Sequence, residues 1–560
     1  MNYDVVLIHP PTIYDFRKQP LFPGALGPTV EKIQFVKAPI GMICIANYID
    51  RHGYKVIIDN LADRMVSDKE FDAEEHLKNT SSRVYAIDLH WHHHAQGAIE
   101  VARICKKLHP DSLVVLGGLT ATYFHEEIMQ KYEFVDAIIR GEGEKALLEF
   151  VRGLKETNEV PHTPNVTCRT KEGEVCVMPL MEASENLDEF EYTRYDLIEP
   201  KTSIFPMGGE SFGNLVVCRG CVYNCVTCGG SSYNYKKYFG MCKPAFRSPK
   251  KIVEDIKSFN AQGINLISLY QDPRMGGEKY WKELFATLRE EKRNIDIDRL
   301  SIDIFSPVDE EFAKEIYSIG KPVVLYMCPE SGDKEVREKQ GRRYSNEDII
   351  DSSEICHRYH IPITFFFSVG LAGENRETFK ETQSLWDKLA SMEQISLSRG
   401  NFGKIARCIG GPIVGPIVLE PGSLSYDYPS KYGYKLSYGS LEEYINALST
   451  PSWHQWLNHE TDELNRNELI KLIFESIAFS IYEREKYGTY DNAKAVFQRS
   501  QLRADMIAVG AVNHIMNIPD SAERKLRLLS LKEAIDSILN SSPLTDDKYG
   551  YRKMMEKVLT

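Results

Sequence analysis

Four cysteines lie within eleven residues near the middle of the chain, and three of them have the spacing of an iron–sulfur site. Cys221, Cys225 and Cys228 follow the pattern C-x3-C-x2-C, directly after a short apolar run at 214–218. One short loop of this length can wrap three thiolates around one side of a 4Fe-4S cluster, which leaves one iron open to a further ligand. The alternative is a four-cysteine zinc site that also uses Cys218. Zinc sites usually pair two distant C-x2-C hooks, so we favour the cluster and interpret Cys218 as a packing residue.

The composition is that of a soluble globular protein in a reducing compartment. The chain has 560 residues and 12 cysteines, and the apolar run at 5–8 does not look like part of a signal peptide, so a disulfide scaffold is not expected. The net charge of −12 argues against a partner of the nucleic-acid class. The longest apolar stretch, 361–373, is shorter than the roughly 20 residues of a membrane helix. We expect a cytoplasmic protein that contacts neither nucleic acid nor membrane.

The elements around the cysteines are predominantly α/β. In residues 1–155 short apolar runs alternate with helix-period segments, which predicts a doubly wound, Rossmann-like parallel sheet covered on both faces. Ligands of such sheets bind beyond the carboxyl ends of the strands. The expected strands are 4–9, 55–59, 84–89, 113–116 and 136–139, and the expected helices are 40–52, 68–79, 96–108, 126–132 and 145–154.

Three further segments follow. Residues 156–205 are rich in Pro, Thr and acidic groups, with a small hairpin at 172–174, and are expected to be a linker. Six strand–helix units in 206–420 predict a partial or full parallel (β/α) barrel, with strands at 214–218, 266–270, 300–304, 323–327, 363–368 and 395–397. Residues 421–560 are mainly helical, with helices expected at 441–448, 463–485, 493–516 and 522–540.

The cysteine loop resembles that of the radical S-adenosylmethionine (SAM) superfamily, and later strand ends extend the resemblance. Glu330 and Ser331 stand in an E-S-G segment that is followed by Arg343, and residues 370–374 read G-L-A-G-E where the family has G-L-P-G-E. The resemblance implies that the open iron chelates SAM and that the acidic residue contacts the SAM ribose. Asp272 occupies a second-strand end where this branch often carries an acidic residue. An external one-electron donor of the flavodoxin or ferredoxin type is also implied.

The N-terminal region resembles the cobalamin-binding domain of the class B branch of that superfamily. The matching strand-end loops are Pro10-Pro11, Gly117-Gly118 with Thr120, and the segment that holds Gly141 and Glu142. The resemblance implies that these loops bind cobalamin. Glycines let the backbone approach a bulky nucleotide tail, and a helix N-terminus accepts its phosphate.

A histidine-rich stretch, 90–94, follows the expected strand 84–89 and allows three interpretations. It begins like the D-x-H-x-x-G motif of enzymes in which a histidine ligates cobalt, but His93 stands in place of the glycine. His90 or a neighbour could therefore ligate cobalt. Alternatively, Trp91 or a histidine packs below the corrin ring without ligation. The third interpretation is a solvated, histidine-rich helix start.

The resemblance implies a cobalamin-dependent radical SAM enzyme that methylates an unactivated carbon. One SAM would methylate reduced cobalamin, and a second would yield the 5′-deoxyadenosyl radical that removes a substrate hydrogen. The same cofactors could instead catalyse a rearrangement or cyclisation, and a non-catalytic cobalamin and iron–sulfur sensor is the alternative of another class. The substrate is a small molecule, peptide or protein, with 421–560 contributing specificity. Some relatives methylate methyl-coenzyme M reductase, including a glutamine.

Overall fold

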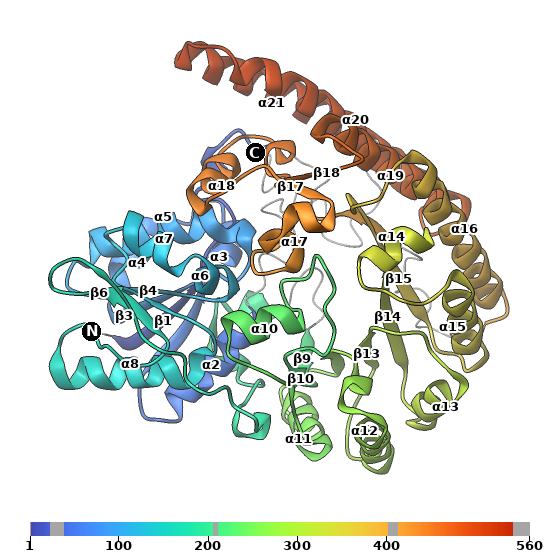
Figure 1. Ribbon diagram of the computed structural model, residues 1–560, viewed down its shortest axis with the longest axis horizontal. Helices are drawn as coiled ribbons and strands as arrows, with labels where there is room; N and C mark the ends of the chain where they lie inside the picture. Colours follow the sequence, from blue (N-terminus) through green and yellow to red (C-terminus); the bar gives the residue numbers. More distant parts are fainter. Residues whose placement is uncertain (1, 23–38, 205–210, 401, 403–412, 541–560) are drawn as a thin grey trace.

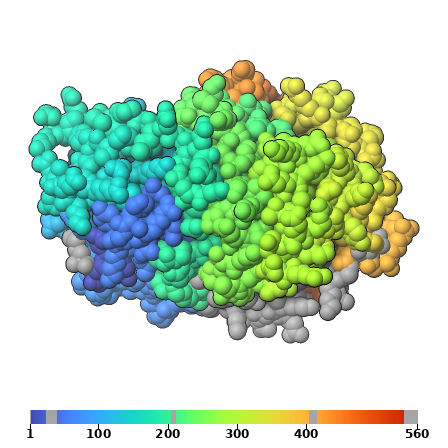
Figure 2. All heavy atoms as spheres, turned by 90° about the horizontal axis from the view of Figure 1, so that it is seen from below, coloured from blue at the N-terminus to red at the C-terminus, as the bar shows by residue number. Residues whose placement is uncertain are grey.

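Two parallel sheets stand side by side, and the C-terminal region lies across both (Figure 1). The structure is a computed structural model that describes residues 2–22, 39–204, 211–400, 402 and 413–540. In the space-filling view the N-terminal and central regions meet along a continuous surface (Figure 2). Within the described residues, no helix is both long enough and apolar enough to cross a bilayer.

The first sheet is doubly wound, as expected, with strand order β7-β6-β5-β4-β3-β1-β2-β8. Its parallel centre comprises β1 (Tyr3–His9), β2 (Val56–Asn60), β3 (Ser82–Asp88), β4 (Leu113–Gly117) and β5 (Ala137–Ile139). The strands are near-continuous apolar runs because helices cover both faces. These helices are α2 (Ile40–Asp50), α3 (Leu61–Ser67), α4 (Ala73–Asn79), α5 (Ala95–Leu108), α6 (Leu119–Tyr123), α7 (His125–Lys131) and α8 (Gly143–Thr157).

The segment expected to be a linker instead completes the first sheet. Strands β6 (Val166–Arg169) and β7 (Val175–Val177) form the expected hairpin, and β6 pairs antiparallel with β5. Strand β8 (Ile198–Glu199) pairs parallel with β2 at the opposite edge. Short strands such as these satisfy the backbone groups of a sheet edge, although their few residues carry little apolar periodicity.

The second sheet is an open, partial barrel of six parallel strands in the order β16-β15-β14-β13-β12-β9. Its strands are β9 (Phe212–Val216), β12 (Leu266–Tyr270), β13 (Arg299–Ile304), β14 (Val323–Glu330), β15 (Ile363–Val369) and β16 (Ile413–Pro416). Its covering helices are α11 (Pro249–Asn260), α12 (Glu278–Glu290), α13 (Glu310–Ser318), α14 (Lys334–Lys339), α15 (Asn346–Arg358) and α16 (Arg376–Ser398).

One expected strand of the barrel is wrong. Residues 395–397 belong to α16, which starts at a capping box formed by Asn375 and Thr378 and continues for 23 residues. Ile395 is 47% exposed near the helix end, so its apolar character there does not mark a buried strand. The sixth strand is β16, which pairs parallel with β15.

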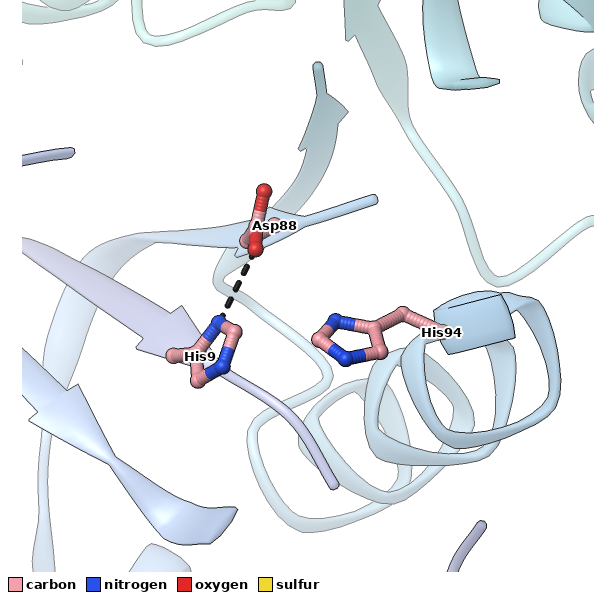
Figure 3. A group of neighbouring side chains, drawn as sticks. All are labelled: His9, Asp88 and His94. Atoms are coloured by element: carbon pink, nitrogen blue, oxygen red, sulfur yellow. Dashed lines mark hydrogen bonds and ion pairs between the residues drawn. The ribbon is translucent and has the colours of Figure 1, made fainter. Parts of the chain in front are cut away.

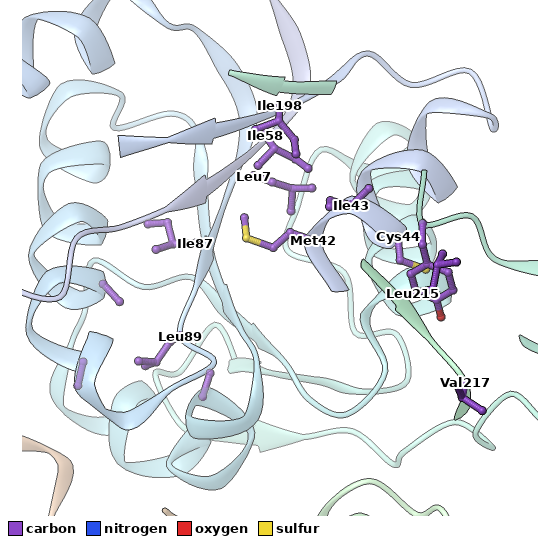
Figure 4. Packing of buried hydrophobic residues seen from close by; sticks show 14 of the residues in the cluster. Leu7, Met42, Ile43, Cys44, Ile58, Ile87, Leu89, Ile198, Leu215 and Val217 are labelled. Atoms are coloured by element: carbon purple, nitrogen blue, oxygen red, sulfur yellow. The ribbon is translucent and has the colours of Figure 1, made fainter. Parts of the chain in front are cut away.

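Helix α2 joins the cores of the two sheets. Met42 and Ile43 face the first sheet, while Cys44 lies beside Leu215 of β9 (Figure 4). These side chains belong to one hydrophobic core that spans both sheets. The position of the second sheet relative to the first is therefore fixed by packing.

The C-terminal region contacts both sheets. It contains α17 (Leu424–Asp427), β17 (Tyr434–Leu436), α18 (Leu441–Leu448), β18 (His459–Thr461), α19 (Arg466–Lys486), α20 (Asn492–Met516) and α21 (Ser521–Asn540). Helix α18 packs on α5 of the first sheet, and α19 packs on β15 and β16 of the second. The Glu127 carboxylate accepts hydrogen bonds from the first backbone N–H groups of α18, at Leu441 and Glu442.

A buried carboxylate connects three segments of the chain. Asp427 of α17 accepts hydrogen bonds from Tyr123 of α6 at 2.9 Å, and from Tyr233 at 2.5 Å and Tyr238 at 2.8 Å, both of α10 (Ser232–Tyr238). Lys237 of α10 completes the group with an ion pair at 2.7 Å. Burial raises the pKa of Asp427, but its four donors lower the pKa more, so it falls below its usual range.

Candidate functional site

A cavity of about 880 Å³ lies between the carboxyl ends of the first sheet and the inner face of the second. Its volume is near the upper end of the range of about 300–1,000 Å³ for small-molecule sites. The first sheet contributes His90, Trp91, Gly117, Gly118, Gly141 and Glu142, and the second contributes Asn214, Ser268 and Tyr270. Both sets of strand ends thus face one shared space.

Gly118 shapes the wall of this cavity through its backbone. Its φ is +113°, and a Cβ there would lie 2.7 Å from the Cα and N atoms of His90. The neighbouring Thr120 is buried, and its hydroxyl donates a hydrogen bond to the His90 carbonyl at 3.0 Å. Thr120 therefore ties two strand-end loops together, and the lack of a side chain at Gly118 lets them approach.

Pro10 and Pro11 are buried below the cavity, where they pack toward α5. A Cβ on Gly97 of α5 would overlap the backbone of Pro11, so this glycine permits the contact. The prolines set the course of the loop after β1, and neither lines the cavity.

Glu142 takes part in an ion-pair bridge between the first α/β region and the chain that enters the cysteine loop. Arg219 of β10 (Cys218–Arg219) lies two residues before Cys221, and its guanidinium donates to Glu142 at 2.8 Å and to Glu144 at 2.6 Å. Burial raises the pKa of Glu144, but Arg219 lowers it more, so the carboxyl titrates below its usual range. The loop of Gly141 and Glu142 therefore also positions the chain that enters the cysteine loop.

The three cysteines lie on the loop between β10 and α10. The Cys221 sulfur accepts a hydrogen bond from the Tyr223 N–H at 3.4 Å, and the Cys228 sulfur accepts one from the Gly230 N–H at 3.3 Å. Burial raises the pKa of the Cys221 and Cys225 thiols, and the nearby Arg342 guanidinium opposes this shift. A cation beside the thiols favours thiolates, the form that binds iron.

Cys218 differs from the other three cysteines in this group. It is buried in β10, and its thiol faces the Gly220 carbonyl at 3.6 Å. Its burial fits a packing role at the strand end, although it also touches the cavity.

The end of β14 directs a carboxylate into the barrel. Glu330 has a φ of +72°, which turns the chain. One of its oxygens accepts from Arg342 at 3.2 Å, and the other accepts from the Ser368 hydroxyl at 2.7 Å. Ser331 is buried, and its hydroxyl accepts from the Asp333 N–H at 3.1 Å, so it supports the turn without facing the cavity.

The arginine beside Glu330 is Arg342, and Arg343, the arginine predicted to contact the cofactor, is exposed. The turn decides between the two neighbours. Gly341 has a φ of +90°, and a Cβ there would lie 3.2 Å from the Asn224 carbonyl of the cysteine loop. The conformation of Gly341 and its contact with the cysteine loop are visible only in the structure, so the sequence alone could not distinguish Arg342 from Arg343.

Asp272, a predicted cofactor contact, is bonded to other residues of the protein. It is fully buried and pairs with Arg274 at 2.7 Å, and it accepts the Phe305 N–H at 2.8 Å. These bonds cap the short helix η6 (Pro273–Gly276) and connect it to the chain after β13. The structure therefore assigns Asp272 a scaffold position.

A second carboxylate inside the barrel escaped the sequence analysis. Asp303 of β13 lies close to Tyr270 of β12, and burial raises the pKa of Asp303 to about 6. The alternation of buried apolar and less buried polar residues along β13 could have indicated it. Asp303 supplies a hydrogen-bond acceptor on β13, beside Tyr270 and the backbone of Gln271.

The stretch 90–94 is buried, which contradicts a solvated helix start. His92, His93 and His94 are each at most 6% exposed, and Trp91 precedes them at the cavity wall. The His92 ring lies 3.8 Å from that of Tyr444 of α18, and His93 Nδ1 lies 2.7 Å from the Tyr444 hydroxyl. The C-terminal region therefore holds this loop against the first sheet.

Two family models match successive parts of the chain. The radical SAM superfamily matches residues 215–385, which include the cysteine loop, Glu330 and Arg342. The B12 binding domain matches residues 28–151. These two ranges contribute the opposite walls of the shared cavity.

Curated relatives and a solved structure agree with these matches. An uncharacterized methyltransferase of Pyrococcus horikoshii is 26% identical over 394 residues, 69% of this chain and 78% of that protein. An anaerobic magnesium-protoporphyrin IX monomethyl ester cyclase of Cereibacter sphaeroides is 23% identical over 361 residues, 62% of this chain and 55% of that protein. The radical SAM methyltransferase TsrM of Kitasatospora setae, solved with cobalamin and a [4Fe-4S] cluster, has a TM-score of 0.59 at 15% identity; the match covers 95% of this chain and 100% of that one, which shows the fold.

Proposed function

Since the chain is a radical SAM protein with an N-terminal B12-binding domain, we propose that it transfers a methyl group from SAM to an unactivated carbon. The observation that carries this proposal is the single cavity shared by the two sets of strand ends. A cobalamin held by the first sheet would face the inner surface of the barrel, where a substrate and SAM would lie. When bound, the cluster supplies the electron for SAM cleavage and cobalamin carries the methyl group.

The chain's own residues would bind and orient these groups. Cys221, Cys225 and Cys228 would hold the cluster, and Glu330 would accept a hydrogen bond from the SAM ribose. The Arg342 guanidinium pairs with the Glu330 carboxylate at 3.2 Å and holds it in place. The shared core around α2 fixes the spacing of the two sheets, and with it the distance between the groups that they would hold.

For the substrate we propose a peptide or protein side chain, with a glutamine of methyl-coenzyme M reductase as the specific candidate. The open second sheet supports this class, because a partial barrel leaves a wider entrance for an extended segment than a closed barrel does. Inside the barrel, the Asp303 carboxylate could accept a hydrogen bond from a carboxamide N–H. The C-terminal region, packed beside β15 and β16, would contribute to the choice of substrate.

The one-electron donor is proposed to be a flavodoxin or ferredoxin. The proposal rests on the chemistry of the cluster, because reductive cleavage of SAM consumes an electron that the side chains of this chain do not supply.

A rearrangement or cyclisation with the same cofactors is the second candidate. The relationship to the magnesium-protoporphyrin cyclase favours it, since that relative is matched over 62% of this chain. The methyltransferase relative is matched over more of the chain and at higher identity, so methyl transfer remains the first proposal.

The test is anaerobic turnover of the reconstituted protein with SAM, cobalamin, a reductant and a peptide that contains the candidate glutamine. Methyl transfer predicts 5′-deoxyadenosine, S-adenosylhomocysteine and a peptide heavier by one methyl group in place of hydrogen. A product altered without that mass increase supports the second candidate. If SAM is cleaved but no S-adenosylhomocysteine forms with any substrate tried, methyl transfer is refuted.

A further inference from the structure

Two histidines and an aspartate meet below the cavity, at the carboxyl ends of adjacent strands. His9 ends β1, Asp88 ends β3, and His94 directly precedes α5 (Figure 3). One potential ligand atom from each residue lies within 4.8 Å of the other two. His9 Nδ1 lies 2.9 Å from Asp88 Oδ2, and the two imidazole centroids are 5.0 Å apart.

The three side chains are suited to a cation because of their chemistry and burial. His9 and His94 are fully buried, and Asp88 is 8% exposed. An imidazole nitrogen and a carboxylate oxygen each offer a lone pair to a metal ion. Two imidazoles and one carboxylate form a donor set that zinc(II) and iron(II) accept, whereas magnesium and calcium prefer oxygen ligands.

The group lies at the wall of the cavity, because Asp88 also lines it. The strand order reverses between β1 and β3, which makes this edge the point where doubly wound sheets bind ligands. The loop after β1 folds over the start of α5, where the Gly97 N–H donates to the Thr12 carbonyl at 3.1 Å. A site bounded by β1, β3 and α5 draws on three elements whose relative positions the fold already fixes.

We propose that His9, Asp88 and His94 bind one divalent transition-metal ion of the zinc class, separate from both the cluster and cobalt. A zinc ion with bonds of about 2.0–2.1 Å requires a modest inward movement of the rings, and it leaves one position for water. The ion would tie β1, β3 and the start of α5 together. Because Trp91 packs edge-on against His94 at 5.4 Å, the ion would also fix the loop that lines the cobalamin cavity.

The experiment measures zinc in the anaerobically reconstituted holoenzyme, in which the cluster occupies its cysteines. Wild type and variants are incubated with zinc chloride and gel filtered, and zinc is counted by mass spectrometry. We expect about one zinc per chain in wild type and at least about a tenfold loss of affinity in H94Q and D88N. Zinc-edge X-ray absorption should show nitrogen and oxygen ligands without sulfur.

A matched histidine–aspartate pair provides the control. His76 Nε2 lies 2.7 Å from Asp59 in the same sheet, but Arg64 stands where a second imidazole would be needed. H76Q should therefore retain the wild-type zinc content. Circular dichroism and cluster absorbance confirm that each variant is folded. Equal zinc in wild type and H94Q, or a sulfur-dominated absorption spectrum, would overturn the proposal.

Discussion

The two α/β regions differ in what the loops at their strand ends present. The loops of the second region present reactive side chains, the thiols of Cys221 and Cys225 and the Glu330 carboxylate paired with Arg342, which lie outside the lining of the cavity. The first sheet presents mainly backbone and rings, such as the Gly118 turn and the Trp91 loop. Reactive side chains are suited to bind a cluster and a charged cosubstrate, whereas a shaped backbone surface is suited to bind a large corrin. Substitutions in the second region should therefore abolish the reaction, and substitutions in the first should weaken cobalamin binding.

The largest effect is expected at the cysteine loop. Alanine at Cys221, Cys225 or Cys228 should abolish SAM cleavage, because each thiolate would hold one iron. Cys218→Ala should keep about four irons per chain, since the Cys218 thiol is buried against the Gly220 carbonyl. Iron content and 5′-deoxyadenosine formation check both statements. A Cys218→Ala protein without iron would contradict the assignment.

The corresponding loss in the first sheet is expected at Gly118. Gly118→Trp should reduce cobalamin occupancy to background, because even a Cβ there meets the His90 backbone at 2.7 Å. The control is Gly53→Trp, which has a comparable φ of +84° but no atom within 4 Å of its Cβ. The measurement is corrin absorbance after gel filtration. Unchanged occupancy in Gly118→Trp would refute a cobalamin-binding role for this turn.

An intermediate effect should follow from breaking the ion-pair bridge of Arg219. Arg219→Met leaves Glu144 buried and unpaired, which should cost about 3 kcal/mol of unfolding free energy. The Arg289–Glu315 pair is much more exposed, so Arg289→Met should cost less than about 1 kcal/mol. Thermal unfolding of the two variants against wild type measures the difference.

The Arg219→Met deficit should also depend on pH. The pKa of Glu144 is lowered in the folded protein, so its ion pair stabilises the fold above the ordinary value of 4.5 and is lost as the pH falls through the lower, folded value. The deficit should therefore be full at neutral pH and shrink in acid. A deficit that stays constant from pH 7 to below 4.5 would show that the bridge contributes no charge stabilisation.

The smallest effect is expected at Trp91. If Trp91 caps the lower face of the corrin without ligation, Trp91→Ala should let water or a histidine coordinate cobalt and slow methyl transfer. SAM cleavage should be largely preserved because the cysteine loop and Glu330 are untouched. The pair of rates, 5′-deoxyadenosine and methylated product, tests this. Two unchanged rates would remove Trp91 from the cobalt environment, and loss of cobalamin in His90→Ala alone would favour axial ligation.

The difference between the two regions also explains which parts of the fold and of the site could be predicted from the sequence. The doubly wound sheet and the partial barrel followed from long apolar periodicities, and the fold agrees with them. The cysteine loop was recognisable because its chemistry lies in eight consecutive residues. Glu142 was recognised only as part of a glycine-rich turn, and its bond to Arg219 joins residues 77 positions apart. A local sequence pattern cannot predict a contact between residues so far apart in the chain.

The sequence also could not predict which of two adjacent residues makes a given contact. Arg342 and Arg343 are adjacent and chemically identical, and only the positive φ of Gly341 turns the first of them toward Glu330. The sixth strand was misplaced because Ile395, Ser396 and Leu397 alternate like a strand, whereas they belong to the last turns of α16.

Asp427 has a consequence for dividing the chain into separately expressed pieces. Its carboxylate is the shared acceptor for donors from α6 and α10, and it is contributed by α17, far along the chain. A fragment that stops before α17 lacks the shared acceptor of three tyrosine hydroxyls and the Lys237 ammonium. The contact between α6 and α10 should therefore be weaker in such a fragment than in the full chain.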